Sequence, residues 1–129
     1  MICAINTGTQ TVTQYKNVSF QACQSTSCNE QLQNNKVKLF FPGVYAVQWS
    51  VTGYAVNRGM VKFQVNAEKN AIASCEASAQ VEENKLVTLT SAPVMIVHQN
   101  QTVPLALSLQ NRGSAMILSN AVLTVRKVY

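Results

Sequence analysis

The chain has 129 residues and a mass of 14.1 kDa, which is the size of a single domain, taken here as residues 1–129. Hydrophobic residues make up 47% of the chain and charged residues only 12%, so the composition excludes global disorder. The chain has no aspartate, five glutamates and one histidine, and it therefore lacks the groups that most catalytic and calcium sites require. We expect a protein that is not an enzyme, with no catalytic residues, no metal and no cofactor.

The basic residues give a net charge of +5, but they form no run longer than two. Nucleic-acid binding requires several cations on one face, so we expect no nucleic-acid partner. No apolar run reaches the roughly 18 residues of a membrane helix, and the first residues lack the basic and apolar regions of a signal peptide. We therefore expect neither membrane insertion nor a signal peptide.

The first third of the chain predicts one strand and one long loop. Residues Thr9–Phe20 are rich in Thr, Val and Tyr, which favours a strand. The polar stretch Cys23–Asn35 predicts a long mobile loop. Within it, Cys23 and Cys28 form a candidate local disulfide, which would need an oxidising environment.

From residue 37 onward, apolar and polar residues alternate, which is typical of strands with one buried face. Residues 67–80 are rich in Ala, Glu and Lys, but a helix there would have only a thin apolar stripe, so a strand is favoured over a helix. Turn residues separate the predicted strands at roughly 8–15-residue intervals, which indicates an all-β antiparallel β-sandwich, most simply a jelly roll. The alternating strands are Val37–Phe41, Tyr45–Val51, Val61–Val65, Leu105–Leu109 and Ala121–Val125.

The segment Val37–Val51, with Pro42-Gly43 between two strands, resembles the globular heads of complement-component and tumour-necrosis-factor (TNF) type. The blocks Val103–Ser114 and Ser119–Tyr129 fit the last strands of that family. The same blocks resemble domains of bacillus collagen-like spore-surface proteins and trimeric head and tail appendages of bacteriophages. The resemblance implies a TNF-like jelly roll of about ten strands that forms a compact homotrimer. Two features depart from it, because the 129 residues contain no Gly-X-Y tract and the acidic calcium ligands of some members have no counterpart.

Apolar residues near the end of the chain suggest where such a trimer would make contact. The run Val94–Val97 is apolar on both faces, which fits either a fully buried strand or a strand with its second face against a neighbouring subunit. The terminal Tyr after an alternating strand suits an anchored end rather than a frayed one. The candidate trimer contacts are Tyr54, Val94, Ile96, Val128 and Tyr129.

Individual residues allow two interpretations each. We expect Tyr45 and Trp49 in the core, the alternative being the trimer axis or a sugar-stacking groove. We expect His98 to be an exposed loop residue rather than half of a Cys75–His98 nucleophilic pair, with Cys3 and Cys75 as small buried residues.

These observations predict a non-enzymatic structural or binding module that forms a homotrimer on the outside of a particle. The favoured role is a bacteriophage virion decoration, head-fibre or tail-appendage protein on the virion surface, with capsid or tail proteins as partners. Host-surface carbohydrate is a further candidate partner of the amide-rich stretches Asn29–Asn35, Gln99–Thr102 and Gln110–Ser114, the alternative being a merely hydrated exterior. The alternative role is an adhesion or signalling head of a longer collagen-like protein, located extracellularly or on a cell or spore surface.

Overall fold

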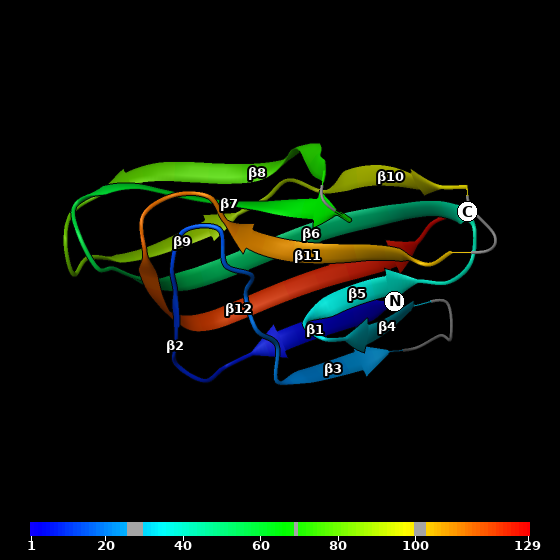
Figure 1. Ribbon diagram of the computed structural model, residues 1–129, viewed down its shortest axis with the longest axis horizontal. Coiled ribbons are helices and arrows are strands. Elements are labelled where there is room, and N and C mark those ends of the chain that lie inside the picture. The colour runs from blue at the N-terminus through cyan, green and yellow to red at the C-terminus, as the bar shows by residue number, and fades with distance from the viewer. Residues whose placement is uncertain (26–29, 69, 100–102) are drawn as a thin grey trace.

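The computed structural model describes residues 1–25, 30–68, 70–99 and 103–129, which form two antiparallel sheets and no helix (Figure 1). Sheet A has seven strands in the order β10-β6-β12-β1-β3, with β9 pairing with β6 and β2 pairing with β12. Sheet B has five strands in the order β4-β5-β11-β7-β8. The strands are β1 (Ile2–Asn6), β2 (Gln10–Val12), β3 (Ala22–Ser25), β4 (Glu30–Gln33), β5 (Lys36–Leu39), β6 (Gly43–Ala55), β7 (Gly59–Ala67), β8 (Asn70–Val81), β9 (Leu86–Thr90), β10 (Val94–His98), β11 (Leu105–Asn111) and β12 (Met116–Lys127).

The core lies between the two sheets and is filled mainly by alternate residues of the longer strands. On β6, Tyr45 and Trp49 are at most 1% exposed, so both are core residues as predicted. The Trp49 ring packs against Phe63 of sheet B at a centroid distance of 6.2 Å. Its indole Nε1 donates a hydrogen bond of 3.0 Å to the Cys75 carbonyl oxygen, so the side chain has both apolar and polar partners in the opposite sheet.

A glycine marks the place where β12 bends beside β6. The register of the two strands shifts between Leu118 and Asn120, next to Gly53. A Cβ atom on Gly53 would clash with the Ile117 carbonyl oxygen and would lie 2.8 Å from the Leu118 Cα. The bulge therefore requires a residue without a side chain at this position.

The Ala-rich stretch forms a strand, as predicted. In β8, Cys75 is buried and Glu76, Ser78 and Gln80 are exposed. This period of two overrides the helix propensity of alanine and glutamate because β7 pairs with β8 over residues 76–81 and again at residues 70–71.

Two predictions for the first third of the chain are wrong. Residues 9–20 do not form one strand, because β2 on sheet A ends at Val12 and the chain then turns through Tyr15, whose φ is 68°. Beyond this turn Asn17 bridges to Gln110 of β11, a strand of sheet B. The second wrong prediction is the long loop Cys23–Asn35, because most of β3 and all of β4 lie within it. These two strands are edge strands of sheets A and B.

Candidate functional site

The outer face of sheet A, formed by the side chains that alternate with the core, is mostly uncharged. Across its centre the β6 and β12 side chains pair as Gln48–Thr124, Ser50–Val122 and Thr52–Asn120. The seven strands of this sheet contain no glutamate, and Arg126 is their one charged residue at an outward position. Lys127, which follows it, alternates to the other side, opposite the buried Tyr45.

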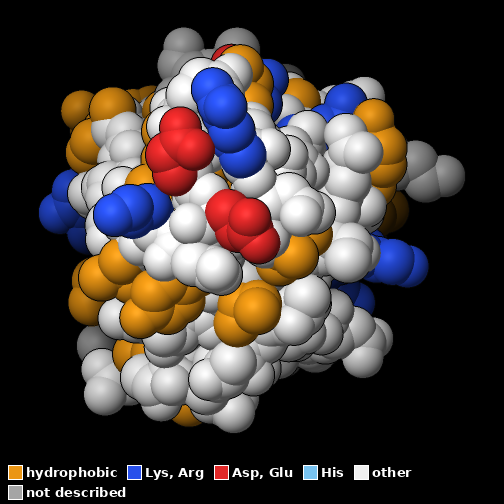
Figure 2. Space-filling view, turned by 90° about the vertical axis from the view of Figure 1, so that its left-hand side faces the viewer, with side chains coloured by type: hydrophobic (Ala, Val, Ile, Leu, Met, Phe, Trp, Pro, Cys, Tyr) orange, Lys and Arg blue, Asp and Glu red, His pale blue; other side chains and the backbone are white. Residues whose placement is uncertain are grey.

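Large apolar side chains are exposed at one end of this face. Tyr54 on β6 lies between Leu86 on β9 and Ile117 on β12, and these side chains are 43%, 61% and 37% exposed. Figure 2 looks at this end of the molecule and shows hydrophobic side chains gathered beside a small group of charged ones. The predicted contact residue Tyr54 therefore lies on an exposed apolar row.

The second apolar group is at the other end of the face, on β10. Its register places Val94 opposite Val47 and Ile96 opposite Tyr45, both of which are core positions. Ile96 is 9% exposed and Val94 packs partly against the core, whereas Met95 and Val97 are 58% and 60% exposed. The strand has one buried and one exposed apolar face, which fits the interpretation that its second face meets a neighbouring subunit. The exposed face is formed by Met95 and Val97, and not by the predicted contact residues Val94 and Ile96. All four residues are apolar, so residue type does not show which two face outward. The register of β10 with β6 shows it.

The chain terminus is anchored beside this second group, as expected. The Val128 amide donates to the Val44 carbonyl oxygen at 2.7 Å, and the Val44 amide donates to the Tyr129 carbonyl oxygen at 3.3 Å. Val128 is half-buried, and the Tyr129 side chain is 82% exposed. Backbone pairing thus fixes the position of Tyr129 while its ring remains accessible.

Two shallow hollows lie on the uncharged centre of the same face. The first has a volume of about 210 Å³ and the second about 260 Å³. They share Gln48 and Thr124, so they adjoin each other. Arg126 at the second hollow is the only charged side chain among the residues lining either one.

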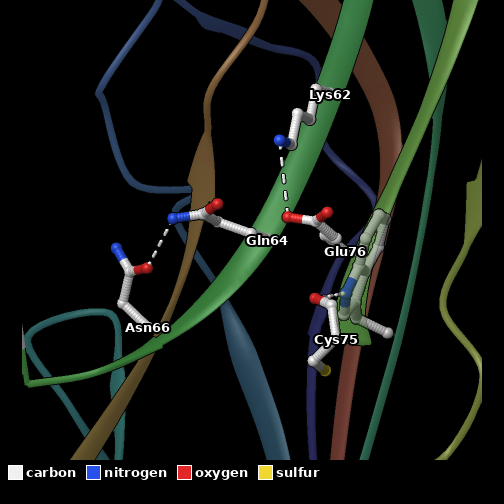
Figure 3. Close-up of polar contacts among 6 residues, drawn as sticks. Lys62, Gln64, Asn66, Cys75 and Glu76 are labelled. Carbon is white, nitrogen blue, oxygen red and sulfur yellow. Dashed lines mark hydrogen bonds and ion pairs between the residues drawn. The ribbon is translucent and has the colours of Figure 1, made fainter. Parts of the chain in front are cut away.

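The outer face of sheet B differs, because it carries charges and an amide network. Lys62 and Glu76 form an ion pair of 3.4 Å, and Gln64 donates to the Asn66 side chain at 2.8 Å (Figure 3). Asn66 donates in turn to Gln110 at 2.8 Å, and Gln110 donates to the Tyr15 carbonyl oxygen at 3.0 Å. These amides satisfy one another and hold the 15–18 segment at the edge of β11.

The amide network limits which of the expected carbohydrate-binding stretches have free side chains. Gln110 belongs to it, and Asn111 is fully buried and donates to the Val12 carbonyl oxygen at 2.8 Å. In the stretch 29–35, Asn35 accepts from the Phe20 amide. Residues 29 and 100–102 lie outside the described part of the chain.

The side chains with catalytic potential are dispersed. The prediction that His98 lies in an exposed turn is wrong, because it ends β10 opposite Gly43 and is 5% exposed. Cys75 is buried, and burial raises the pKa of its thiol, an effect that hydrogen bonds with Ser91 and Trp49 partly offset. Within the described residues, no three His, Cys, Asp or Glu side chains come together in a group that could hold a metal ion.

The proposed Cys23–Cys28 disulfide is not tested, because Cys28 lies outside the described residues. Cys23 is exposed on β3, and Cys3 is half-buried rather than buried as expected. The described part of the chain contains no helix long and apolar enough to span a membrane.

No protein-family model matches the chain, and no curated protein sequence matches it either. Its structure is similar to that of Eiger TNF from S. frugiperda, with a TM-score of 0.74 and 11% sequence identity over 98% of this chain and 92% of that one. It is also similar to the PRD1 vertex protein P5 (TM-score 0.65, 16% identity, 99% and 96% covered) and to murine APRIL (TM-score 0.65, 9% identity, 98% of each chain covered). The domain therefore has the TNF-like jelly-roll fold that the sequence resemblance implied.

Proposed function

We propose that this chain is a non-enzymatic structural or binding module that forms a homotrimer through the outer face of sheet A. The trimer is displayed on the outside of a particle, as a bacteriophage virion decoration, head-fibre or tail-appendage protein. Its partners are two further copies of itself, capsid or tail proteins, and carbohydrate on the host surface.

The observation that carries this proposal is the distribution of charge and apolar side chains between the two outer faces. The chain has a net charge of +5, so association through a charged face would bring like charges together. The strands of sheet A carry one charged side chain at an outward position, Arg126, and the face exposes Tyr54 and Met95 at its two ends. Another copy of the chain can cover such a face at a small cost in free energy, because few charged groups are desolvated.

The structural similarities support the role without specifying it. One similar protein is, by its name, a vertex protein of PRD1, and the other two are a TNF and APRIL. Placement on a particle is consistent with the first of these and with the sequence resemblance to phage appendages. The similarity to a TNF and to APRIL is equally compatible with the second candidate role, a surface-exposed head of a longer collagen-like protein.

Light scattering of the purified chain tests the assembly. Three chains of 14.1 kDa give a mass of about 42 kDa, and this is the expected result at micromolar concentration. A mass of one chain at that concentration would contradict the trimer.

Antibody labelling tests the location. Gold-labelled antibody should decorate intact, purified virions at discrete sites. Labelling confined to a cell or spore surface, together with Gly-X-Y repeats in the same polypeptide, would replace the virion role by that of a collagen-like protein head.

A further inference from the structure

A hollow of about 320 Å³ lies on the outer side of sheet B, away from the proposed subunit contacts. Its volume is at the lower end of the range for small-ligand sites, about 300–1,000 Å³. Three parts of the chain form it, namely the β4–β5 hairpin, the turn after β7 and the start of β11. The lining residues are Gln33, Asn34, Lys36, Lys38, Glu68, Val103, Pro104 and Ala106.

Two lysines supply the positive charge of the hollow. Lys36 and Lys38 are both half-buried and alternate with the fully buried Val37 and Leu39, so both project to the outer side of β5. Residues two apart on a strand are about 7 Å apart along it, a spacing that lets two ammonium groups approach one anionic group. Neither lysine forms an ion pair with any other described residue.

Glu68 is held in place on the opposite side of the hollow. Its backbone amide donates to the Ala106 carbonyl oxygen at 2.8 Å, and its Oε1 accepts from the Ala106 amide at 3.0 Å. The residue has a positive φ of 57°, so these two contacts fix a backbone conformation that is uncommon for glutamate. The carboxylate is thereby positioned as a fixed acceptor that retains further capacity for hydrogen bonds.

The hairpin turn places amide side chains at the rim. Asn34 and Asn35 have φ values of 51° and 62°, as a two-residue hairpin turn requires, and Asn34 and Gln33 line the hollow. Val103 and Pro104, which directly precede β11, contribute apolar surface. The hollow thus combines cations, one carboxylate, two amides and an apolar wall.

We propose that this hollow binds an acidic saccharide, a sugar ring that carries a carboxylate. The lysines pair with the carboxylate, Glu68 and the amides bind hydroxyl groups, and the C–H face of the ring packs on Val103 and Pro104. A bare anion such as phosphate fits less well because Glu68 would repel it, and a neutral sugar leaves both ammonium groups unpaired. The inference deepens the proposed binding function by giving the carbohydrate a location and a charge.

The test uses the full chain and three probes in NMR titrations of the backbone amides. D-Glucuronate and D-glucose differ only in the carboxylate, and inorganic phosphate represents a bare anion. Glucuronate should shift the amides around the hollow and should bind about tenfold more tightly than glucose, because two partly exposed charge pairs contribute roughly this much. If glucuronate leaves these amides unshifted at tens of millimolar, the proposal is wrong.

Two double variants with the same charge change test the role of the lysines. K36Q/K38Q should lose about tenfold in affinity for glucuronate, and K16Q/K85Q, with exposed lysines elsewhere, should bind as the unchanged chain does. Equal affinities of the two double variants would overturn the proposal.

Glu68→Gln distinguishes the saccharide from a bare anion, since it removes the negative charge and keeps an oxygen for the Ala106 amide. We expect weaker glucuronate binding and stronger phosphate binding. Stronger binding of both probes would mean that the hollow is an anion site only, and the saccharide proposal would fail.

Light scattering on the same samples separates this inference from the proposed function. A trimer that does not bind glucuronate leaves the assembly standing and rejects the saccharide site. A monomer that binds glucuronate at the hollow does the reverse.

Discussion

Trp49 connects the two sheets through its ring and through its indole nitrogen. The ring packs on Phe63, and Nε1 donates to the Cys75 carbonyl oxygen, so both contacts reach sheet B. The Trp49 backbone is tied to Ser91 as well, with its amide donating to Ser91 Oγ and its carbonyl oxygen accepting from the Ser91 amide, both at 3.0 Å. Hydrogen bonds to Ser91 therefore fix the backbone of Trp49, and its side chain packs against sheet B.

Trp49→Ala should lower the free energy of unfolding by about 3–5 kcal/mol, because it leaves a large cavity and an unpaired buried carbonyl. Chemical denaturation measures this loss. Trp49→Phe keeps much of the volume and removes the N–H donor, so its loss should be clearly smaller. A Trp49→Ala variant that unfolds at the same denaturant concentration as the parent would place the indole outside the core.

Cys75 should make stability fall at alkaline pH. Burial holds its folded-state pKa above 9.0, so the unfolded chain releases this proton first as pH rises. The unfolded state then binds fewer protons than the folded one, and the stability that is fully present below about pH 9 decreases above it. Urea unfolding at pH 7 to 10 should show the decrease, and Cys75→Ala should reduce it. An equal alkaline decrease in the two proteins would contradict this assignment.

At the scale of the strands, the pairing partner of a strand determines its position and the side on which its residues lie where the local sequence does not. The alternation in β6, β7, β11 and β12 was sufficient to predict these strands and their buried faces. Residues 9–20 also looked like one strand, yet they pass from sheet A to sheet B, and such a change of sheet has no signal in the alternation. His98 could not be placed from sequence because its side depends on the register of β10 with β6. The lysines and the glutamate of the hollow are about 30 residues apart, and only the pairing of β5 and β7 with β11 brings them together.

The β12 bulge predicts a strong requirement for glycine at position 53. Gly53→Ala should cost about 2–3 kcal/mol in thermal or chemical unfolding, because the added Cβ meets backbone atoms that cannot move independently. Gly8→Ala is a suitable control, since its Cβ would meet mainly the side chain of Gln21, which is exposed and can shift. Equal losses in the two variants would show that the close approach of β6 and β12 is not the cause.

At the scale of the molecule, the outer face of sheet A has the proposed role of subunit contact and the outer face of sheet B that of saccharide binding. The outer face of sheet A has the apolar ends and uncharged centre that suit burial against other copies. The outer face of sheet B carries the lysines and the Lys62–Glu76 ion pair and would remain in solvent. Assembly through one face would therefore repeat the hollow of sheet B three times on the outside of a trimer, where multivalency raises avidity for a surface that carries many saccharides.

Two methionines with similar exposure test this division directly. Met95 on sheet A is 58% exposed and Met60 on sheet B is 48% exposed, and both alternate with buried residues. Met95→Glu should dissociate the proposed trimer to single chains in light scattering, because the new carboxylate would be buried without a partner in each proposed subunit contact. The fold should survive, since the side chain points away from the core, and circular dichroism checks this.

Met60→Glu introduces the same charge on the other outer face, where water remains in contact with it. We expect this variant to keep the mass of three chains and the melting temperature of the parent. If Met60→Glu dissociates the assembly and Met95→Glu does not, the subunits meet through sheet B, and the hollow between Lys36 and Glu68 then lies on the face that carries the contact. If neither variant changes the mass, the contact avoids both methionines and depends instead on the end of sheet A that exposes Tyr54 and Ile117, which Tyr54→Glu would reveal by the same measurement.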